Sequence, residues 1–243
     1  MSKPSAALKI YQTPEQLADF CAAYILECLA QDIKAQSRAT LAISGGSSPR
    51  LLFTRMAQAN FNWSDIHIFW VDERCVPPTD SQSNFKLAKE TLLDVARIPK
   101  ANIHRIHGEL PPDEAATRYV NEVKQFFGIG NDGALPSFDI VHRGMGVEGH
   151  TASLFPGEPL IQNTTDIAAH VWVEKVKMDR ITLLPGMLRA AKRTVLQVAG
   201  ADKAPAVREV LTGAENPMTY PCQIGSRDAR ATWFLDNAAA AQL

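Results

Sequence analysis

The stretch that decides the fold is TLAISGGSSP, residues 40–49. Residues 40–44 form a short, mostly apolar run, as expected of a strand that is buried on both faces. Two glycines and two serines then allow a tight turn, and Pro49 suits the first position of a helix. The stretch therefore predicts a strand, a turn and a helix in that order, which is the repeating unit of parallel sheets.

The same order recurs along the rest of the chain. Strands that alternate with helices pair in parallel through right-handed crossovers. We therefore expect a single α/β domain, residues 1–243, with a doubly wound, mainly parallel, Rossmann-like sheet flanked by helices. The expected strands are residues 40–44, 66–71, 138–141, 194–198 and 233–235, and the expected helices begin near Thr13, Pro49 and Asn84, with two more around Tyr119 and Val207.

The first helix is predicted by its capping residues. Thr13 can accept a hydrogen bond from the first helical N–H groups, and Gln16 can complete a capping box. Apolar residues follow at helical spacing and include Cys21 and Cys28, which we interpret as core residues. None of the four cysteines forms a C-x-x-C pair, so we expect a reduced, cytoplasmic protein.

The charge balance limits the partners that the chain is expected to bind. The formal net charge is −1 and no basic run is present, which argues against nucleic acid. No stretch approaches the roughly 18 consecutive apolar residues of a membrane span, and the N-terminus lacks the pattern of a secretory signal. We therefore expect a small-molecule ligand, and any anion site must be built from local groups.

Glycine-rich and charged residues gather where predicted strands end and helices begin. In an open parallel sheet these ends share one edge, and ligands bind in the crevice beyond that edge. Four segments are therefore expected to converge in space, namely residues 44–48, 72–74, 144–151 and 200–203.

The segment Ser44-Gly45-Gly46-Ser47-Ser48 is a candidate anion-binding loop. It can present backbone N–H groups and serine hydroxyls at the start of the next helix. The alternative is a simple strand-to-helix turn in which Ser48 caps the helix. The segment is not a P-loop, because no Gly-Lys-Ser/Thr sequence follows.

Arg74 and Lys203 are candidate ligands for the same anion. A guanidinium at a strand end can bind phosphate through paired hydrogen bonds, although Arg74 could instead form a surface ion pair with Glu73 or Asp80. Lys203 falls in the first turn of a predicted helix, where a positive charge is unfavourable unless an anion is bound. An exposed lysine without a ligand is the alternative for Lys203.

The segment GMGVEGHT, residues 144–151, matches the G-x-G-x-x-G pattern of dinucleotide sites. Its late position in the chain and the histidine after the third glycine argue against a dinucleotide. We expect His150 to lie at a helix start, where the dipole keeps the imidazole neutral and able to accept a proton. A structural histidine is the alternative, but the neighbouring segments favour a general base. His104 and His107 lack an apparent third ligand, so we expect no metal site and no cofactor.

Taken together, these segments resemble the signatures of the 6-phosphogluconolactonase family. The resemblance runs in order from about residue 40 to residue 203, and it implies the single-domain sugar-phosphate isomerase/lactonase type of α/β fold. The matching segments are LAISGGSSP (41–49), VDERCVP (71–77), GMG and GHTASLFPG within residues 144–157, RITL (180–183) and residues 200–203.

The related glucosamine-6-phosphate deaminases share the phosphate loop and the Asp-Glu pair. Arg74 and the residues after His150 favour the lactonases. Three departures from the lactonase pattern lie near the expected site: Ser48 replaces threonine, Glu148 replaces aspartate, and Arg143 occupies a position that is typically apolar. We expect that Arg143 and Glu148 could pair with each other. Leu184 and Arg189 also depart from the pattern.

The resemblance implies an enzyme that hydrolyses 6-phospho-D-glucono-1,5-lactone to 6-phospho-D-gluconate in the oxidative pentose phosphate pathway. His150 is expected to activate water as general base, with Asp72 or Glu148 orienting its ring. The alternatives are a glucosamine-6-phosphate deaminase-like enzyme and a non-catalytic sugar-phosphate-binding protein. We expect a monomer or weak homodimer that binds neither nucleic acid nor membrane. The expected substrate ligands are Ser44, Gly45, Gly46, Ser47, Ser48, Arg74, Arg180 and Lys203.

Overall fold

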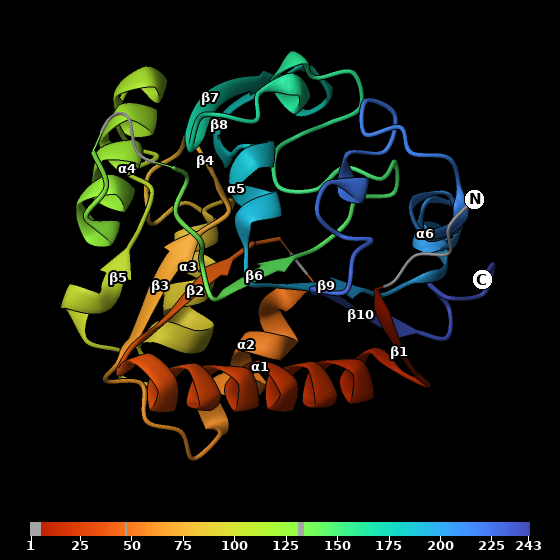
Figure 1. Ribbon diagram of the computed structural model, residues 1–243, viewed down its shortest axis with the longest axis horizontal. Coiled ribbons are helices and arrows are strands. Elements are labelled where there is room, and N and C mark those ends of the chain that lie inside the picture. Colours follow the sequence, from red (N-terminus) through yellow and green to blue (C-terminus); the bar gives the residue numbers. More distant parts are fainter. Residues whose placement is uncertain (1–5, 47, 131–133) are drawn as a thin grey trace.

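A parallel sheet crosses the centre of the molecule (Figure 1). The structure, a computed structural model, describes residues 6–46, 48–130 and 134–243. Within these residues the sheet has seven strands in the order β1-β10-β9-β6-β2-β3-β5, and each neighbouring pair is parallel. The strands are β1 (Ala7–Tyr11), β2 (Ala39–Ile43), β3 (Ile66–Trp70), β5 (Ile103–His104), β6 (Ile140–Arg143), β9 (Arg193–Val198) and β10 (Ala231–Asp236).

Helices cover both faces of this sheet, which confirms the predicted α/β fold. In Figure 1, α1 and α2 lie below the sheet, and α5 lies above it. The α-helices are α1 (Pro14–Gln36), α2 (Pro49–Gln58), α3 (Asn84–Ala88), α4 (Pro112–Phe127), α5 (Pro185–Ala190) and α6 (Ala204–Thr212). The shorter turns are a π-helix, η1 (Lys89–Leu93), and the 3₁₀ helices η2 (Lys100–Asn102), η3 (Pro159–Gln162), η4 (Glu174–Val176), η5 (Ala201–Lys203) and η6 (Pro221–Gln223).

Helix α1 begins as its sequence predicts. Thr13 Oγ1 accepts a hydrogen bond from the Gln16 backbone N–H at 3.3 Å. The side chain of Gln16 accepts from the backbone of Gln12, one residue earlier than an ideal capping box requires. Cys21 and Cys28 are buried in the core, as expected.

A second, smaller sheet was not predicted from the sequence. It is antiparallel, in the order β4-β8-β7, and consists of β4 (Asp72–Arg74), β7 (Ala168–Val173) and β8 (Met178–Leu183). Residues 72–74, which the sequence placed at the end of a strand, form a strand of their own in this second sheet. The chain leaves the parallel sheet at Val71, whose carbonyl accepts from the Leu183 N–H at 2.8 Å, and enters the second sheet at once.

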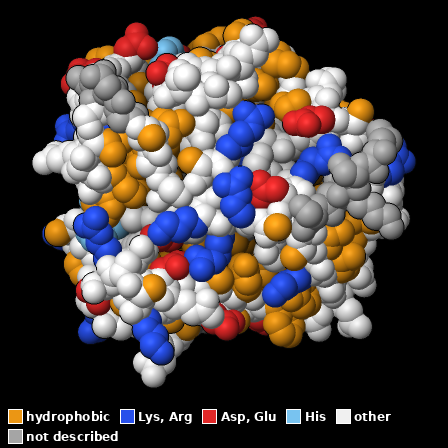
Figure 2. Space-filling view, in the orientation of Figure 1, with side chains coloured by type: hydrophobic (Ala, Val, Ile, Leu, Met, Phe, Trp, Pro, Cys, Tyr) orange, Lys and Arg blue, Asp and Glu red, His pale blue; other side chains and the backbone are white. Residues whose placement is uncertain are grey.

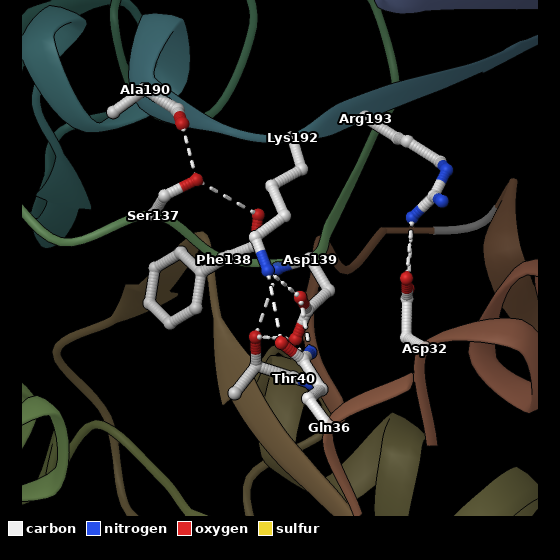
Figure 3. A network of polar contacts seen from close by, with 9 residues as sticks. All are labelled: Asp32, Gln36, Thr40, Ser137, Phe138, Asp139, Ala190, Lys192 and Arg193. Carbon is white, nitrogen blue, oxygen red and sulfur yellow. Dashed lines mark hydrogen bonds and ion pairs between the residues drawn. The ribbon is translucent and has the colours of Figure 1, made fainter. Parts of the chain in front are cut away.

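A cluster of polar side chains holds the opposite, amino-terminal end of the large sheet together. We call Gln36, Thr40, Asp139 and Lys192 the Asp139 cluster. Figure 3 shows the other three side chains directed at the carboxylate of Asp139, which accepts from Lys192 Nζ at 2.7 Å. The cluster links the end of α1 to the starts of β2, β6 and β9, so it is structural and lies far along the strands from their carboxyl ends.

The surface in Figure 2 shows Lys and Arg side chains interspersed with Asp and Glu side chains. This distribution agrees with a formal net charge of −1. Within the described residues, no helix is both long enough and apolar enough to cross a membrane.

Candidate active site

The predicted site segments meet in one cavity of about 200 Å³. The cavity lies where the strand order of the large sheet reverses: the chain runs from β2 outward to β3 and β5, and then returns to β6 on the other side of β2. Loops that follow the two strands at such a point diverge and leave a crevice between them. The predicted residues that line the cavity are Ser44, Gly45, Gly46, Ser48, Asp72, Arg74, His150, Arg180 and Lys203.

Two predicted residues stand apart from that set. Ser47 lies outside the described residues. Glu148 contacts His150 and does not appear among the described residues that line the cavity.

The loop after β2 approaches the cavity with its backbone. Gly46 has a φ of +93°, a conformation that a glycine adopts without strain. A β-carbon on Gly45 would lie 1.9 Å from Oδ1 of Asn84, so only glycine allows this close approach. Ser48 precedes α2 but its side chain makes no capping hydrogen bond. Ser48 thus occupies the N-cap position of a ten-residue helix beside the cavity, but the side-chain cap of the alternative interpretation is not formed.

Glu73 fixes residues 83–85, and Asn84 of this segment packs against Gly45 in the loop after β2. The carboxylate of Glu73 is 2% exposed and accepts hydrogen bonds from the backbone N–H groups of Arg74, Asn84 and Phe85 and from Ser83 Oγ. Burial raises the pKa of Glu73 to about 7, although the three backbone donors oppose the shift. Since Glu73 is occupied in this way, it orders residues 83–85 and does not neutralise the side chain of Arg74.

Arg74 and Arg180 lie side by side on neighbouring strands of the small sheet. They are directly opposed in the antiparallel pairing of β4 with β8. Like charges in this position repel each other, and burial lowers the pKa of Arg180, with Arg74 adding to the effect. A bound anion would reverse the repulsion between the two guanidinium groups.

The described contacts of Arg74 do not include the predicted surface ion pair. Arg74 Nη1 donates to the carbonyl of Gln82 at 2.5 Å, and its Nε is buried without a hydrogen-bond partner. Within the described residues, neither Glu73 nor Asp80 forms an ion pair with Arg74. That alternative was therefore wrong.

Lys203 reaches the cavity from the end of η5, directly before α6. Its ammonium lies 3.6 Å from a carboxylate oxygen of Asp202, a longer contact than a hydrogen bond. Its position before α6 is the one expected from the sequence, where an anion would offset the unfavourable helix dipole.

Asp72 lines the cavity and binds the hydroxyl of Ser153. Ser153 Oγ donates to Asp72 Oδ2 at 2.7 Å, and Arg180 Nη1 lies 3.4 Å from the same hydroxyl oxygen. Asp72 is 5% exposed, so its carboxylate provides a buried negative charge beside Arg180. The hydrogen-bond partner of the His150 ring is Glu148, not Asp72.

His150 directly follows a turn at residues 147–149 and does not lie at a helix start, so this part of the prediction was wrong. Its Nδ1 is 3.0 Å from Glu148 Oε2, and its ring stacks on Phe155 with centroids 4.0 Å apart. Burial lowers the pKa of His150, opposed by the carboxylates of Glu148 and Asp72. The ring is therefore kept neutral by desolvation, without a contribution from a helix dipole.

The predicted pairing of Arg143 with Glu148 was also wrong. Arg143 is fully buried and donates to the carbonyls of Ile224 and Gly225, at 2.7 and 3.3 Å. Glu148 is instead shared between His150 and Lys175. The arginine at this usually apolar position binds the backbone around η6, which leaves Glu148 available to His150.

Some residues of the site were not identified from the sequence. Ser153 joins Asp72 to Arg180, and Lys175 contacts Glu148 from the turn between β7 and β8. Ser153 lies within the quoted segment GHTASLFPG but was not singled out, and Lys175 has no local sequence signal. Both residues act through side chains that only the second sheet brings near. The remaining cavity residues are Gly144, Met145, Gly146, Thr151 and Ala152, which belong to the glycine-rich segment already singled out.

The described part of the chain contains no cluster of three or more His, Cys, Asp or Glu side chains placed to hold a metal ion. His104 binds Glu122 at 2.9 Å and His67 at 3.0 Å, which accounts for both of its ring nitrogens.

Comparisons with known proteins connect this site to a family. The profile of the family described as glucosamine-6-phosphate isomerases/6-phosphogluconolactonase matches residues 12–233. A 6-phosphogluconolactonase of Nostoc sp. is 37% identical over 220 residues, which cover 90% of each chain.

Solved structures share the fold. A 6-phosphogluconolactonase from Thermotoga maritima superposes with a TM-score of 0.83 at 24% identity, covering 95% of this chain and 99% of that chain. A monomeric glucosamine-6-phosphate deaminase of the NagB superfamily gives 0.82 at 18% identity, covering 98% and 100%. At these identities the likeness concerns the fold alone, whereas the profile and the Nostoc relative concern the sequence. The chain therefore belongs to the glucosamine-6-phosphate isomerase/6-phosphogluconolactonase family, and within it to the 6-phosphogluconolactonases.

Proposed function

We propose that this protein hydrolyses 6-phospho-D-glucono-1,5-lactone to 6-phospho-D-gluconate, in the oxidative pentose phosphate pathway. The observation that carries the proposal is that one cavity contains a histidine of lowered pKa together with Arg74, Arg180 and Lys203. Hydrolysis of a phosphorylated lactone needs both a base for water and cations for the phosphate. The reaction named for the Nostoc relative is consistent with this combination.

His150 is the proposed general base. Its Nδ1 donates to Glu148 Oε2, which leaves Nε2 with a free lone pair to accept a proton from water. The 3.0 Å contact supports Glu148 as the carboxylate that orients the ring. A positioned base of this kind accelerates a reaction by about 10²–10⁴-fold.

The reaction needs no covalent intermediate, because a lactone is already an activated ester. Water loses a proton to His150 and its oxygen attacks the lactone carbonyl, which forms a tetrahedral oxyanion. The bond from that carbon to the ring oxygen then breaks, and the imidazolium returns the proton to the departing oxygen. The step yields a carboxylic acid and a hydroxyl group, and the acid then loses its proton to solvent to give 6-phospho-D-gluconate.

Arg74, Arg180 and Lys203 are proposed to bind the phosphate, with help from the N–H groups after β2. The opposed guanidinium groups of Arg74 and Arg180 suit a doubly charged anion. Asp72 is assigned to orienting Ser153, whose hydroxyl it binds directly and which in turn contacts Arg180. Holding the phosphate fixes the distance between the lactone carbonyl and His150.

The test generates the lactone in situ and compares its disappearance with the spontaneous rate. His150→Ala should lower kcat by about 10²–10⁴-fold with KM nearly unchanged. Arg74→Ala should mainly raise KM, by roughly ten- to a hundredfold, because it removes charge-assisted hydrogen bonds to the phosphate.

A parallel assay measures ammonia released from glucosamine 6-phosphate. Release of ammonia without acceleration of lactone hydrolysis would favour the deaminase alternative. Equal loss of affinity in the His150 and Arg74 variants would contradict the division of roles between base and phosphate ligand.

A further inference from the structure

The turn between β7 and β8 contacts the site from outside the cavity. Its short helix, η4, carries Lys175, whose ammonium forms an ion pair with Oε1 of Glu148. The other carboxylate oxygen of Glu148, Oε2, contacts Nδ1 of His150. Glu148 therefore bridges a lysine on one side and the proposed base on the other.

The other two charged residues of this turn, Glu174 and Lys177, pair with each other, whereas Lys175 pairs with Glu148. Glu174 accepts hydrogen bonds from Lys177 and from the indole of Trp172. Lys175 lines a neighbouring hollow of about 480 Å³ and is absent from the described lining of the active-site cavity. Its ammonium is thus placed behind the carboxylate and not among the proposed phosphate ligands.

The small sheet connects this turn to the site through continuous strand pairing. Strand β8 follows the turn, pairs with β7 from Val173↔Met178 onward, and carries Arg180 opposite Arg74. The position of Lys175 is therefore determined by the same strand pairing that brings Arg180 into the cavity.

We propose that Lys175 is a positioning residue: it holds the carboxylate of Glu148 so that one oxygen faces the His150 ring. The inference rests on the proposed function, since it concerns the base of that reaction. An unrestrained glutamate side chain has three rotatable bonds and a longer reach than aspartate, so a second contact is needed to select one orientation. Lys175 supplies that contact at the position where this chain has Glu148.

The charges around the pair predict the direction of the pH effect. Lys175 and His150 face Glu148, whose pKa is held at about 2 by the Lys175 hydrogen bond against the opposing effect of burial. Glu148 and Asp72 raise the pKa of His150, while Arg180 lowers it. Arg74 and Lys203 are the other cations that line the cavity. Without Lys175, Glu148 no longer keeps one oxygen on the His150 ring, and the contact that raises the pKa of His150 is weakened. The pKa of His150 should therefore fall.

The experiment compares Lys175→Met with Lys177→Met in lactone hydrolysis from pH 5 to 9. Lys177 lies on the same turn and pairs with Glu174, which makes its variant a matched control. We expect Lys175→Met to lower kcat by roughly tenfold with KM unchanged, and to move the acidic limb of the kcat profile to lower pH. Lys177→Met should change neither, and Lys175→Arg should restore most of the rate because it keeps the cation.

Each other outcome overturns the inference in a distinguishable way. If Lys175→Met behaves as Lys177→Met while His150→Ala is inactive, the positioning role fails and the proposed function stands. A raised KM with an unchanged pH profile would assign Lys175 to substrate binding instead. If His150→Ala keeps full activity, the proposed base fails, and the positioning role fails with it. Because the side chain of Lys175 is 57% exposed, loss of its ion pair should leave folding intact, and a thermal melt checks this.

Discussion

At the scale of single residues, the proposed chemistry depends on how closely the backbone packs around His150. The ring is desolvated by its neighbours, stacked on Phe155 and hydrogen-bonded to Glu148. Gly146 borders the ring: a β-carbon there would lie 2.0 Å from His150 Nδ1 and 2.6 Å from Glu148 Oε2. The glycine is therefore needed for space between the two side chains, and not for a positive φ.

Gly146→Ala should separate the histidine from its carboxylate. The added methyl group cannot share the space that Nδ1 occupies, so the ring must move away from Glu148. We expect kcat to fall by about tenfold to a hundredfold, which is no more than the rate acceleration that a general base provides, with a smaller change in KM. Steady-state kinetics at saturating lactone measure the effect. A variant with unchanged kcat would show that the His150–Glu148 contact is dispensable.

At the scale of secondary-structure elements, the two ends of the sheet have different tasks. The carboxyl ends of β2 and β6 open into the cavity, whereas the amino ends are joined by the Asp139 cluster. Asp139 is 3% exposed and receives hydrogen bonds from Lys192, Thr40 and Gln36. Burial raises the pKa of Asp139, but these hydrogen bonds outweigh it and the net pKa is lowered.

Asp139→Asn should destabilise the fold by about 2–3 kcal/mol, because it removes a charged acceptor from several buried donors. The matched control is Asp19→Asn, which removes an exposed pair with Arg55 and should cost less than about 1 kcal/mol. Urea unfolding at pH 7 measures both variants. Equal losses of stability in the two variants would contradict the structural role of the Asp139 cluster.

The same carboxylate predicts how stability depends on pH. Since the pKa of Asp139 is lower in the folded state than in the unfolded chain, unfolding takes up a proton in acid. Its contribution is complete above the unfolded pKa of about 3.9 and is lost as the pH falls through the lower folded pKa. The free energy of unfolding of Asp139→Asn should therefore fall less steeply than that of the parent protein below about pH 4. Parallel slopes for the two proteins would remove Asp139 as a source of the acid sensitivity.

At the scale of the whole molecule, the cavity joins segments from most of the chain's length. A ligand bound there contacts the loops after β2 and β6, the strands β4 and β8, and the start of α6. Binding should therefore stabilise the complete fold and not one part of it.

The reaction product 6-phospho-D-gluconate should raise the Tm of the protein. At a concentration of 100 times Kd, binding to the folded state alone adds about 2.7 kcal/mol, or roughly 5–10 °C for a chain of this length. Differential scanning fluorimetry measures the shift. Gluconate without the phosphate should give little shift, and Arg74→Ala should lose most of it at the same product concentration. An equal shift with gluconate would contradict a phosphate site at these cations.

Much of the large sheet was predictable from the sequence because its signals are local. The buried strands β2, β3, β6, β9 and β10 are short apolar runs, each within a few residues of its predicted bounds. The edge strand β1 was missed, since Leu8 and Ile10 are more than 40% exposed and give no pattern of burial. The small sheet was missed because β4 has three residues and is a strand only through its pairing with β8.

The candidate site, like the fold, could be predicted only in part from the sequence. Convergence of the four segments followed from sequence, because consecutive parallel strands bring their carboxyl ends to one edge. The environment of His150 did not follow: the sequence suggested a helix dipole, and the structure has a buried turn instead. The partners of Arg143 did not follow from the sequence either. The sequence does not indicate whether a carboxylate or distant backbone carbonyls accept the hydrogen bonds of an arginine, and here the carbonyls of Ile224 and Gly225 do.

By itself, then, the sequence determined the class of fold, the edge of the sheet at which the candidate site lies, and the family whose signatures the chain carries. Only the tertiary structure decided that Glu148 and not Asp72 contacts His150, that Arg180 opposes Arg74, and that Lys175 reaches Glu148. The physical reason is range: apolar periodicity and turn chemistry act within a few residues, whereas desolvation and ion pairing depend on side chains that meet only when distant strands pair.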